Sequence, residues 1–212
     1  MRKSITILAL FFVGLLGAQR AKADSCNGVA AGSNLIQNCA FGTGDFTSWS
    51  GTATTDSPSF TGVDMGDPFT TNPTPYVGLY EAYLGPVGSP DTLSQTFATT
   101  AGNSYTIEFA LLNDAAPDSP YSNSFLATFG GDTLFSESNA PGDAYTLYSF
   151  SDTASGPSTT LQFTAENDTA FFELDSVSVQ AQPAATPEPS SFLLLGSGIL
   201  AMAGAARRRF AR

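Results

Sequence analysis

Residues 24–183 consist of short segments in which apolar and polar side chains alternate, separated by clusters of Gly, Pro, Asp, Asn, Ser and Thr. An alternation with a period of two puts every second side chain on the same face of a β-strand, and no stretch here keeps a helical period. The clearest apolar sets are Tyr105, Ile107, Phe109 and Leu111; Phe125, Ala127 and Phe129; and Leu161, Phe163 and Ala165. The pattern therefore predicts an all-β domain.

Further segments extend this pattern along the chain. The sequence Gly130-Gly131-Asp132 follows one apolar set and predicts a hairpin turn. We expect additional strands at residues 35–39, 46–49, 76–80, 92–99, 145–150 and 170–179. About ten short strands with no helices between them are typical of an antiparallel β-sandwich, and residues 57–75 and 111–123 are expected to be loops at its ends.

The last expected strand breaks its own alternation. Phe172 and Leu174 share one parity, whereas Val177 and Val179 share the other. A β-bulge near Asp175 would let both halves face one core and would re-aim that carboxylate. The alternative is a twisted edge strand.

The N-terminal residues 1–23 have the three parts of a secretory signal peptide. Arg2 and Lys3 are basic, residues 5–16 are apolar, and Ala21-Lys22-Ala23 is a small-x-small cleavage site. We expect cleavage before Asp24; the alternative is an uncleaved anchor, for which the apolar run is short. The sequence therefore predicts export.

The charges are strongly segregated. All eight basic residues lie in the two terminal segments, and all nineteen acidic residues lie between them, where His is also absent. Nucleic-acid binding is therefore excluded, because no group is present there to neutralise phosphates. Imidazole bases, lysine nucleophiles and arginine clamps are absent as well. Ca²⁺ is an obvious partner for so many oxygen ligands, although an acidic soluble surface is the simpler interpretation.

Cys26 and Cys39 are the only cysteines. Export to an oxidising compartment and an even count favour a disulfide between them. Closing a loop of this size stabilises a fold by roughly 3 kcal/mol in the chain-entropy model. We expect it to staple the N-terminal segment to the first strand, with no redox catalysis, because no basic neighbour is present to lower a thiol pKa.

The C-terminal segment resembles the PEP-CTERM sorting signal of exported Gram-negative bacterial proteins. A linker at residues 183–191 contains Pro187, Glu188 and Pro189; residues 192–206 form an apolar transmembrane helix; and residues 207–212 are a cytoplasmic tail with Arg207, Arg208 and Arg209. The helix spans about 22 Å, which is short for a permanent anchor. The resemblance implies an inner-membrane intermediate, processing by an exosortase near the PEP motif, and delivery to the cell surface or the extracellular matrix.

Residues 24–182 form the expected β-sandwich domain, and they resemble domains that often precede this signal. "NLIQNCAFGTGDFTSWS", "LSQTFATTAGNSYTIEFALLND" and "FFELDSVSV" are similar to the first, central and closing strands of galactose-binding jelly rolls found in carbohydrate-binding modules. The resemblance implies an antiparallel jelly-roll β-sandwich. In related modules an acidic residue of the first motif helps to hold a structural Ca²⁺, but Gly42 occupies that position here. Asp45 and Asp175 are then the candidate metal ligands.

Three functions fit these features to different degrees. The favoured one is a non-catalytic cell-surface or matrix protein held among exopolysaccharides. The second is a carbohydrate-binding module with a defined glycan, for which sugars would stack on exposed rings. The aromatic candidates are Trp49, Tyr76, Tyr80, Tyr83, Tyr121 and Tyr148. Tyr83 and Tyr121 are favoured because they are expected in loops, whereas Trp49 is expected inside the core.

The third function is a glycosidase, since two carboxylates alone can cleave a glycosidic bond. Many acidic residues scattered through loops form pairs by chance, and no activated-nucleophile motif is present. We therefore predict that the protein is not an enzyme.

Overall fold

The structure is a computed structural model of the 212-residue chain. It describes residues 26, 29, 32–56, 60–66, 75–116, 122–168 and 170–183. The predicted signal peptide, the PEP linker beyond residue 183, the apolar segment, the basic tail and Tyr121 lie outside these residues. Within the described part, no helix is both long enough and apolar enough to cross a membrane.

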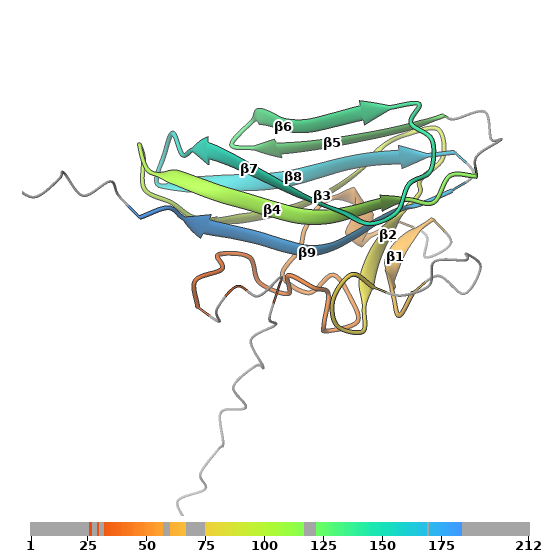
Figure 1. Ribbon diagram of the computed structural model, residues 1–212, viewed down its shortest axis with the longest axis horizontal. Helices are drawn as coiled ribbons and strands as arrows, with labels where there is room; N and C mark the ends of the chain where they lie inside the picture. The colour runs from red at the N-terminus through yellow and green to blue at the C-terminus, as the bar shows by residue number, and fades with distance from the viewer. Residues whose placement is uncertain are drawn as a thin grey trace, which may run out of the picture.

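The described residues fold into strands with one short 3₁₀ helix, which confirms the all-β prediction (Figure 1). In chain order the elements are η1 (Thr52–Thr54), β1 (Thr61–Asp64), β2 (Glu81–Leu84), β3 (Asp91–Ala98), β4 (Ser104–Asn113), β5 (Asn123–Phe129), β6 (Asp132–Ser138), β7 (Thr146–Thr153), β8 (Ser158–Asn167) and β9 (Phe172–Ala181).

The strands form two antiparallel sheets that face each other in Figure 1. The five-stranded sheet has the order β1-β2-β9-β4-β7, and the four-stranded sheet has the order β3-β8-β5-β6. The closing strand β9 thus lies between two earlier strands, β2 and β4. This crossed connectivity is that of the predicted jelly-roll sandwich.

The core lies between the sheets and is dominated by aromatic rings. Phe109 of β4 and Phe163 of β8 come from opposite sheets, are both 0% exposed, and have ring centroids 5.2 Å apart. Phe125 of β5 is 5.8 Å from Phe163. Trp49 is 7% exposed and stacks on Phe41, so its predicted place inside the core is confirmed. The alternating apolar sets of β4, β5 and β8 are therefore the inward-facing sets.

Most of the predicted strands are present. Residues 92–99, 145–150 and 170–179 correspond to β3, β7 and β9. The hairpin turn between β5 and β6 is also confirmed: Phe129 pairs with Asp132, and Gly130 and Gly131 have φ values of 62° and 100°. Glycine adopts such positive φ angles without steric cost, which explains its presence in this tight turn.

Three predicted strands were wrong. Residues 46–49 form a tight turn closed by the hydrogen bond from Trp49 N to Phe46 O. Residues 35–39 form only isolated backbone bonds to β9, and residues 76–80 bend before β2 begins at Glu81. Conversely, residues 57–75 were predicted to be a loop, but Thr61–Asp64 within them pairs with β2 and forms β1. These short segments contain too few residues for alternation to distinguish strand from loop.

The predicted β-bulge in the closing strand is confirmed. Against β4, Ser178 pairs with Glu108 and Asp175 pairs with Ala110. Two residues of β9, Ser176 and Val177, therefore lie opposite the single residue between those partners. Ser176 has a φ of 54°, in the left-handed region that allows the strand to change parity. Both halves of β9 thereby direct their apolar residues into one core.

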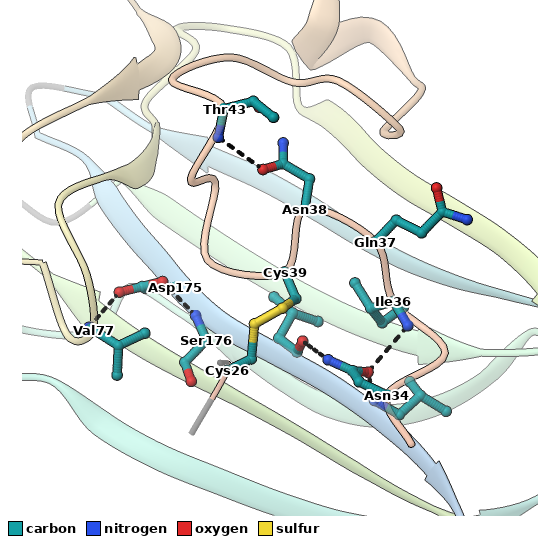
Figure 2. The surroundings of a disulfide bond; sticks show 12 residues. Cys26, Asn34, Ile36, Gln37, Asn38, Cys39, Thr43, Val77, Asp175 and Ser176 are labelled. Atoms are coloured by element: carbon teal, nitrogen blue, oxygen red, sulfur yellow. Dashed lines mark hydrogen bonds between the residues drawn. A yellow bond between two sulfur atoms is a disulfide. The ribbon is translucent and has the colours of Figure 1, made fainter. Parts of the chain in front are cut away.

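The predicted disulfide joins Cys26 to Cys39, with the Cα atoms 6.0 Å apart (Figure 2). Cys26 is 0% exposed and Cys39 is 3% exposed, and both belong to the hydrophobic core cluster. The predicted pairing is therefore confirmed, but the bond fastens the start of the described chain to a segment without strand structure and not to a first strand.

Candidate functional site

Tyr83 lies within strand β2 and not in a loop, which corrects the prediction made for it. Its ring is half-buried and meets the ring of Phe171 edge-on, at 5.5 Å and 88°. Its cross-strand partner is Gly62, and a Cβ at position 62 would collide with the Tyr83 ring. The glycine thus gives the ring room to lie over β1. Tyr121, the other predicted contact, lies outside the described residues.

Four carboxylates share the outer face of the five-stranded sheet with Tyr83. Asp64 of β1 pairs with Glu81 of β2, and Tyr83 pairs with Glu173 of β9. Because residues two apart on a strand share a face, Asp175 lies on the same side as Glu173. Their neighbours Phe172 and Leu174 point into the core, so these carboxylates point away from it. Together with Tyr145, these residues define what we call the acid–tyrosine face.

This face is unusually protected from solvent for a set of acids. Glu81 is 1% exposed, Glu173 is 2% exposed and Asp175 is 0% exposed. A buried carboxylate normally has a basic partner, but no Lys, Arg or His occurs between residues 24 and 206. The side chains that donate hydrogen bonds to these carboxylates are therefore neutral ones.

Tyr145 is one such donor. Its hydroxyl donates a hydrogen bond to Glu81 Oε2. Burial, followed by the charges of Glu81, Glu173 and Asp175, raises the pKa of Tyr145 far above its usual range, so the phenol stays protonated and remains a donor. The ring of Tyr76 lies 5.6 Å from that of Tyr145 and is 36% exposed. An accessible aromatic ring therefore borders the face.

The bulge in β9 determines where the Asp175 carboxylate points (Figure 2). Its Oδ2 accepts a hydrogen bond of 2.7 Å from the N–H of Val77, and its Oδ1 accepts one from the N–H of Ser176. Asp175 thus holds the segment at residues 75–80 against the sheet. The same segment carries Tyr76, so the bulge positions the exposed ring indirectly.

Asp45 lies in a different, exposed turn. Its carboxylate accepts hydrogen bonds from the Thr43 hydroxyl at 2.7 Å and the Thr47 N–H at 2.9 Å. The bonds from Thr47 and Thr43 lower the pKa of Asp45. Among the described residues no group of three or more His, Cys, Asp or Glu is arranged to hold a metal ion. Asp45 and Asp175 alone do not make up a calcium site, and calcium binding stays a prediction.

A second acidic group lies near the opposite edge of the sandwich, around β6 and β7. Burial raises the pKa values of Glu137 and Asp143, and the charge of Asp143 further raises that of Glu137. The Tyr148 pKa is raised by burial and then by both of these charges. The Tyr148 ring packs against Phe135 with centroids 4.5 Å apart. This ring is therefore part of the packing between the two edge strands.

Sequence reasoning identified Tyr83 and Asp175 but missed Glu81, Glu173 and Tyr145 as their neighbours. The alternation along β9 could have shown that Glu173 and Asp175 share a face, because both alternate with core residues. The pairing of β2 with β9 is not visible in the sequence, since 87 residues separate β2 from β9 in the chain. Chemically, the face offers carboxylate acceptors, phenol donors and one accessible ring.

Residues 185–209 match the family described as the PEP-CTERM protein-sorting motif. This span includes the six predicted sorting residues, Pro187, Glu188, Pro189, Arg207, Arg208 and Arg209. The motif implies export and exosortase processing. No curated protein matches the sequence.

The fold is similar to solved structures. One is TmCBM61 in complex with β-1,4-galactotriose, with 16% identity, a TM-score of 0.50, and coverage of 70% of this chain and 99% of that chain. Others are the CBM22-1 xylan-binding domain of Xyn10C from Paenibacillus barcinonensis (14% identity, TM-score 0.43, coverage 69% and 93%), and the K1 cleaved adhesin domain of Lys-gingipain from Porphyromonas gingivalis W83 (13%, 0.49, 68% and 96%).

The likeness to TmCBM61 identifies the fold as the jelly-roll sandwich of carbohydrate-binding modules. The chain thus combines this jelly roll with a C-terminal PEP-CTERM sorting motif, which implies export.

Proposed function

We propose that the protein is a non-catalytic component of the cell surface or extracellular matrix that associates with exopolysaccharide. The observation that carries the proposal is the combination of a sorting motif at residues 185–209 with a carbohydrate-binding-module fold in front of it. The absence of Lys, Arg and His from residues 24–206 supports a binding role over a catalytic one. A carbohydrate-binding module with one defined glycan ligand is the alternative form of this function.

The acid–tyrosine face is the candidate contact surface for a sugar chain. Tyr76 offers an exposed ring on which the apolar face of a sugar can stack. Tyr83 lies further in on the same face, and its pKa is raised by burial and then by the charges of Asp64 and Glu173. Its phenol therefore stays protonated and can donate to a sugar oxygen. The partly exposed carboxylate of Asp64 can accept hydrogen bonds from sugar hydroxyls.

Substituting the two rings will weaken binding to the producing cell's own polysaccharide. We expect Tyr76→Ala and Tyr83→Ala each to reduce affinity about tenfold, because each removes ring contact from the sugar. The measurement is affinity electrophoresis of the purified protein in gels with and without the polymer. Tyr148→Ala is the matched control, since Tyr148 is also half-buried but lies by the opposite edge. Equal mobility of all three variants and the parent in the polymer gel would contradict the assignment.

Tyr121 remains a predicted sugar contact outside the described residues. Tyr121→Ala belongs in the same gels. A loss of retardation in this variant alone would move the binding surface away from the acid–tyrosine face and towards the residues that precede β5.

The sorting motif leads to a prediction about the mature chain. We expect an exosortase to cleave near Pro187, Glu188 and Pro189, because the apolar segment behind them is short for a lasting anchor. Mass spectrometry of the protein from surface and matrix fractions should then find the residues after this motif missing. Recovery of the full-length C-terminus from the inner membrane alone would overturn the prediction.

Calcium is the remaining proposed ligand, with Asp45 and Asp175 as candidate contacts. A metal that binds only the folded state raises its apparent stability, so chelation would lower the unfolding temperature. We expect EDTA to lower this temperature and added Ca²⁺ to restore it, while Mg²⁺ restores less. Identical unfolding curves with EDTA and with excess Ca²⁺ would remove calcium from the proposal.

A glycosidase is the less favoured alternative. It would require two carboxylates on either side of a bound sugar bond, whereas Glu81, Glu173 and Asp175 are each at most 2% exposed. Release of reducing sugars from the polymer that the protein binds would reverse this preference.

A further inference from the structure

Residues 34–41 lie beside β9 in the position that a further strand of the sheet would occupy, and we call them the closure segment. Strand β2 pairs with β9 only up to Leu174. Beyond that point the closure segment bonds to β9: Leu35 N donates to Val179 O at 2.9 Å, and Val177 N donates to Cys39 O at 2.9 Å. Asn34 Oδ1 also accepts from the N–H of Val179 at 2.9 Å. The closure segment therefore covers the part of β9 that β2 leaves open.

The closure segment also reaches the other sheet. Gln37 N donates to Gln95 Oε1 of β3 at 2.7 Å, and Gln95 Nε2 donates back to Gln37 O at 3.0 Å. Between these bonds, Ile36 is 4% exposed and Phe41 is 0% exposed, so both belong to the core. The closure segment thus bonds to both sheets and covers the hydrophobic core between β9 and β3.

The disulfide fastens this closure segment at its end (Figure 2). Cys39 contributes both the carbonyl that accepts from Val177 and the sulfur that is bonded to Cys26. The closure segment has no regular strand pairing of its own, so its position depends on separate bonds and on burial. Linking residues 13 apart removes chain entropy from the open form and favours the closed one.

We propose that the Cys26–Cys39 bond is a redox latch that locks the closure segment in place after export. In a reducing compartment both cysteines remain thiols, and the closure segment opens more readily. In an oxidising compartment the two thiols exchange with an external disulfide. One S–S bond forms between Cys26 and Cys39, the external disulfide is reduced to two thiols, and both protons pass to those products. The chain therefore stays easier to unfold before it crosses the membrane.

The proposal predicts that reduction of the disulfide speeds hydrogen exchange only near the closure segment. This can be measured on the folded, wild-type full-length chain. We expect dithiothreitol followed by alkylation to speed hydrogen exchange at the amides of Leu35, Val177 and Val179 by about 100-fold. The amide of Gly130, which donates to Thr160 O on the hairpin side of the other sheet, should keep its rate. The contrast separates opening of the closure segment from unfolding of the whole domain.

Trp49 provides an independent readout because it is the only tryptophan. Its Nε1 donates to Asn38 O of the closure segment at 3.1 Å, and its ring stacks on Phe41. Reduction should shift its emission to longer wavelength as water reaches the ring. A Cys26→Ser/Cys39→Ser variant should show the shifted emission without reductant and no further change with it.

Two results would overturn the latch. One is unchanged exchange at Leu35, Val177 and Val179 after complete reduction. The other is an equal acceleration at these amides and at Gly130, which would make the disulfide a general stabiliser of the fold. Both readouts are independent of sugar binding, so a failure of the proposed function leaves the test intact.

Discussion

Phe163→Ala will lower the free energy of unfolding by about 3–5 kcal/mol. Phe163 is 0% exposed and lies at the centre of the aromatic core, with ring centroids 5.2 Å from Phe109, 5.8 Å from Phe125 and 6.2 Å from Trp49. These neighbours come from both sheets and from the N-terminal segment, so they cannot all move inward to fill the space. The cavity term therefore adds to the lost burial of the ring.

The measurement is urea unfolding monitored by circular dichroism. Trp49 fluorescence is unsuitable as the signal, because Trp49 contacts the substituted ring and its emission would change even without unfolding. Phe60→Ala is the matched control. Phe60 is 42% exposed, so the same substitution should cost less than about 1 kcal/mol there. Similar losses for the two variants would show that Phe163 does not have the central packing role assigned to it.

Mild acid will stabilise the folded domain, which reverses the behaviour of proteins held by salt bridges. Burial raises the pKa of Asp91, and it also raises those of Glu137 and Asp143 at the β6–β7 edge. A carboxyl with a higher pKa in the folded state binds its proton more tightly there than in the unfolded chain. Stability therefore rises as pH falls from 7 through the raised values, and levels off near the ordinary carboxyl pKa of about 4.

The effect has few opposing contributions. No basic side chain lies between residues 24 and 206, so acid breaks no Lys, Arg or His ion pair in the domain. Asp45 acts in the opposite direction because its pKa is lowered, but its carboxylate is on an exposed turn where solvent weakens the effect. We expect unfolding in low salt to cost on the order of 1 kcal/mol more at pH 5 than at pH 7, after allowance for solvent screening.

Thermal unfolding between pH 4 and pH 8 checks this expectation. Glu137→Gln should flatten part of the profile, because burial and the charge of Asp143 raise the pKa of Glu137 in the folded state. A steady loss of stability from pH 7 to pH 5 in the parent protein would contradict the sign of the effect.

The sequence predicted the long strands well because each carries its own signal. In β4, β5 and β8 three or more apolar residues alternate with polar ones, and burial of one face requires that pattern. The bulge in β9 was predictable for the same reason. The apolar residues on either side of it alternate regularly, so the shift from even to odd positions is visible in the sequence. The PEP-CTERM motif was recognisable from the order of its three parts.

The site was less predictable because it depends on pairing between distant strands. Tyr83 was expected in a loop, since β2 has only four residues and no clear alternation. Its cross-strand partner Glu173 is far away in sequence, and only the sheet order β1-β2-β9 brings the two together. Tyr145, which donates to Glu81, is equally distant in the chain. Residues 35–39 of the closure segment were predicted to be a strand, and this prediction was wrong. The role of the closure segment depends on single bonds to two different sheets, which no local pattern encodes.

The edge strands β6 and β7 affect how copies of the protein meet when they are crowded together. Each has one side without a neighbouring strand in its sheet, and such edges can pair with another molecule. Side-by-side contact here would bring Asp132 and Glu137 of one copy near acids of the next, with no basic group in either domain to offset them. Mutual repulsion should therefore keep crowded copies of the domain separated, so that they do not associate through their strand edges.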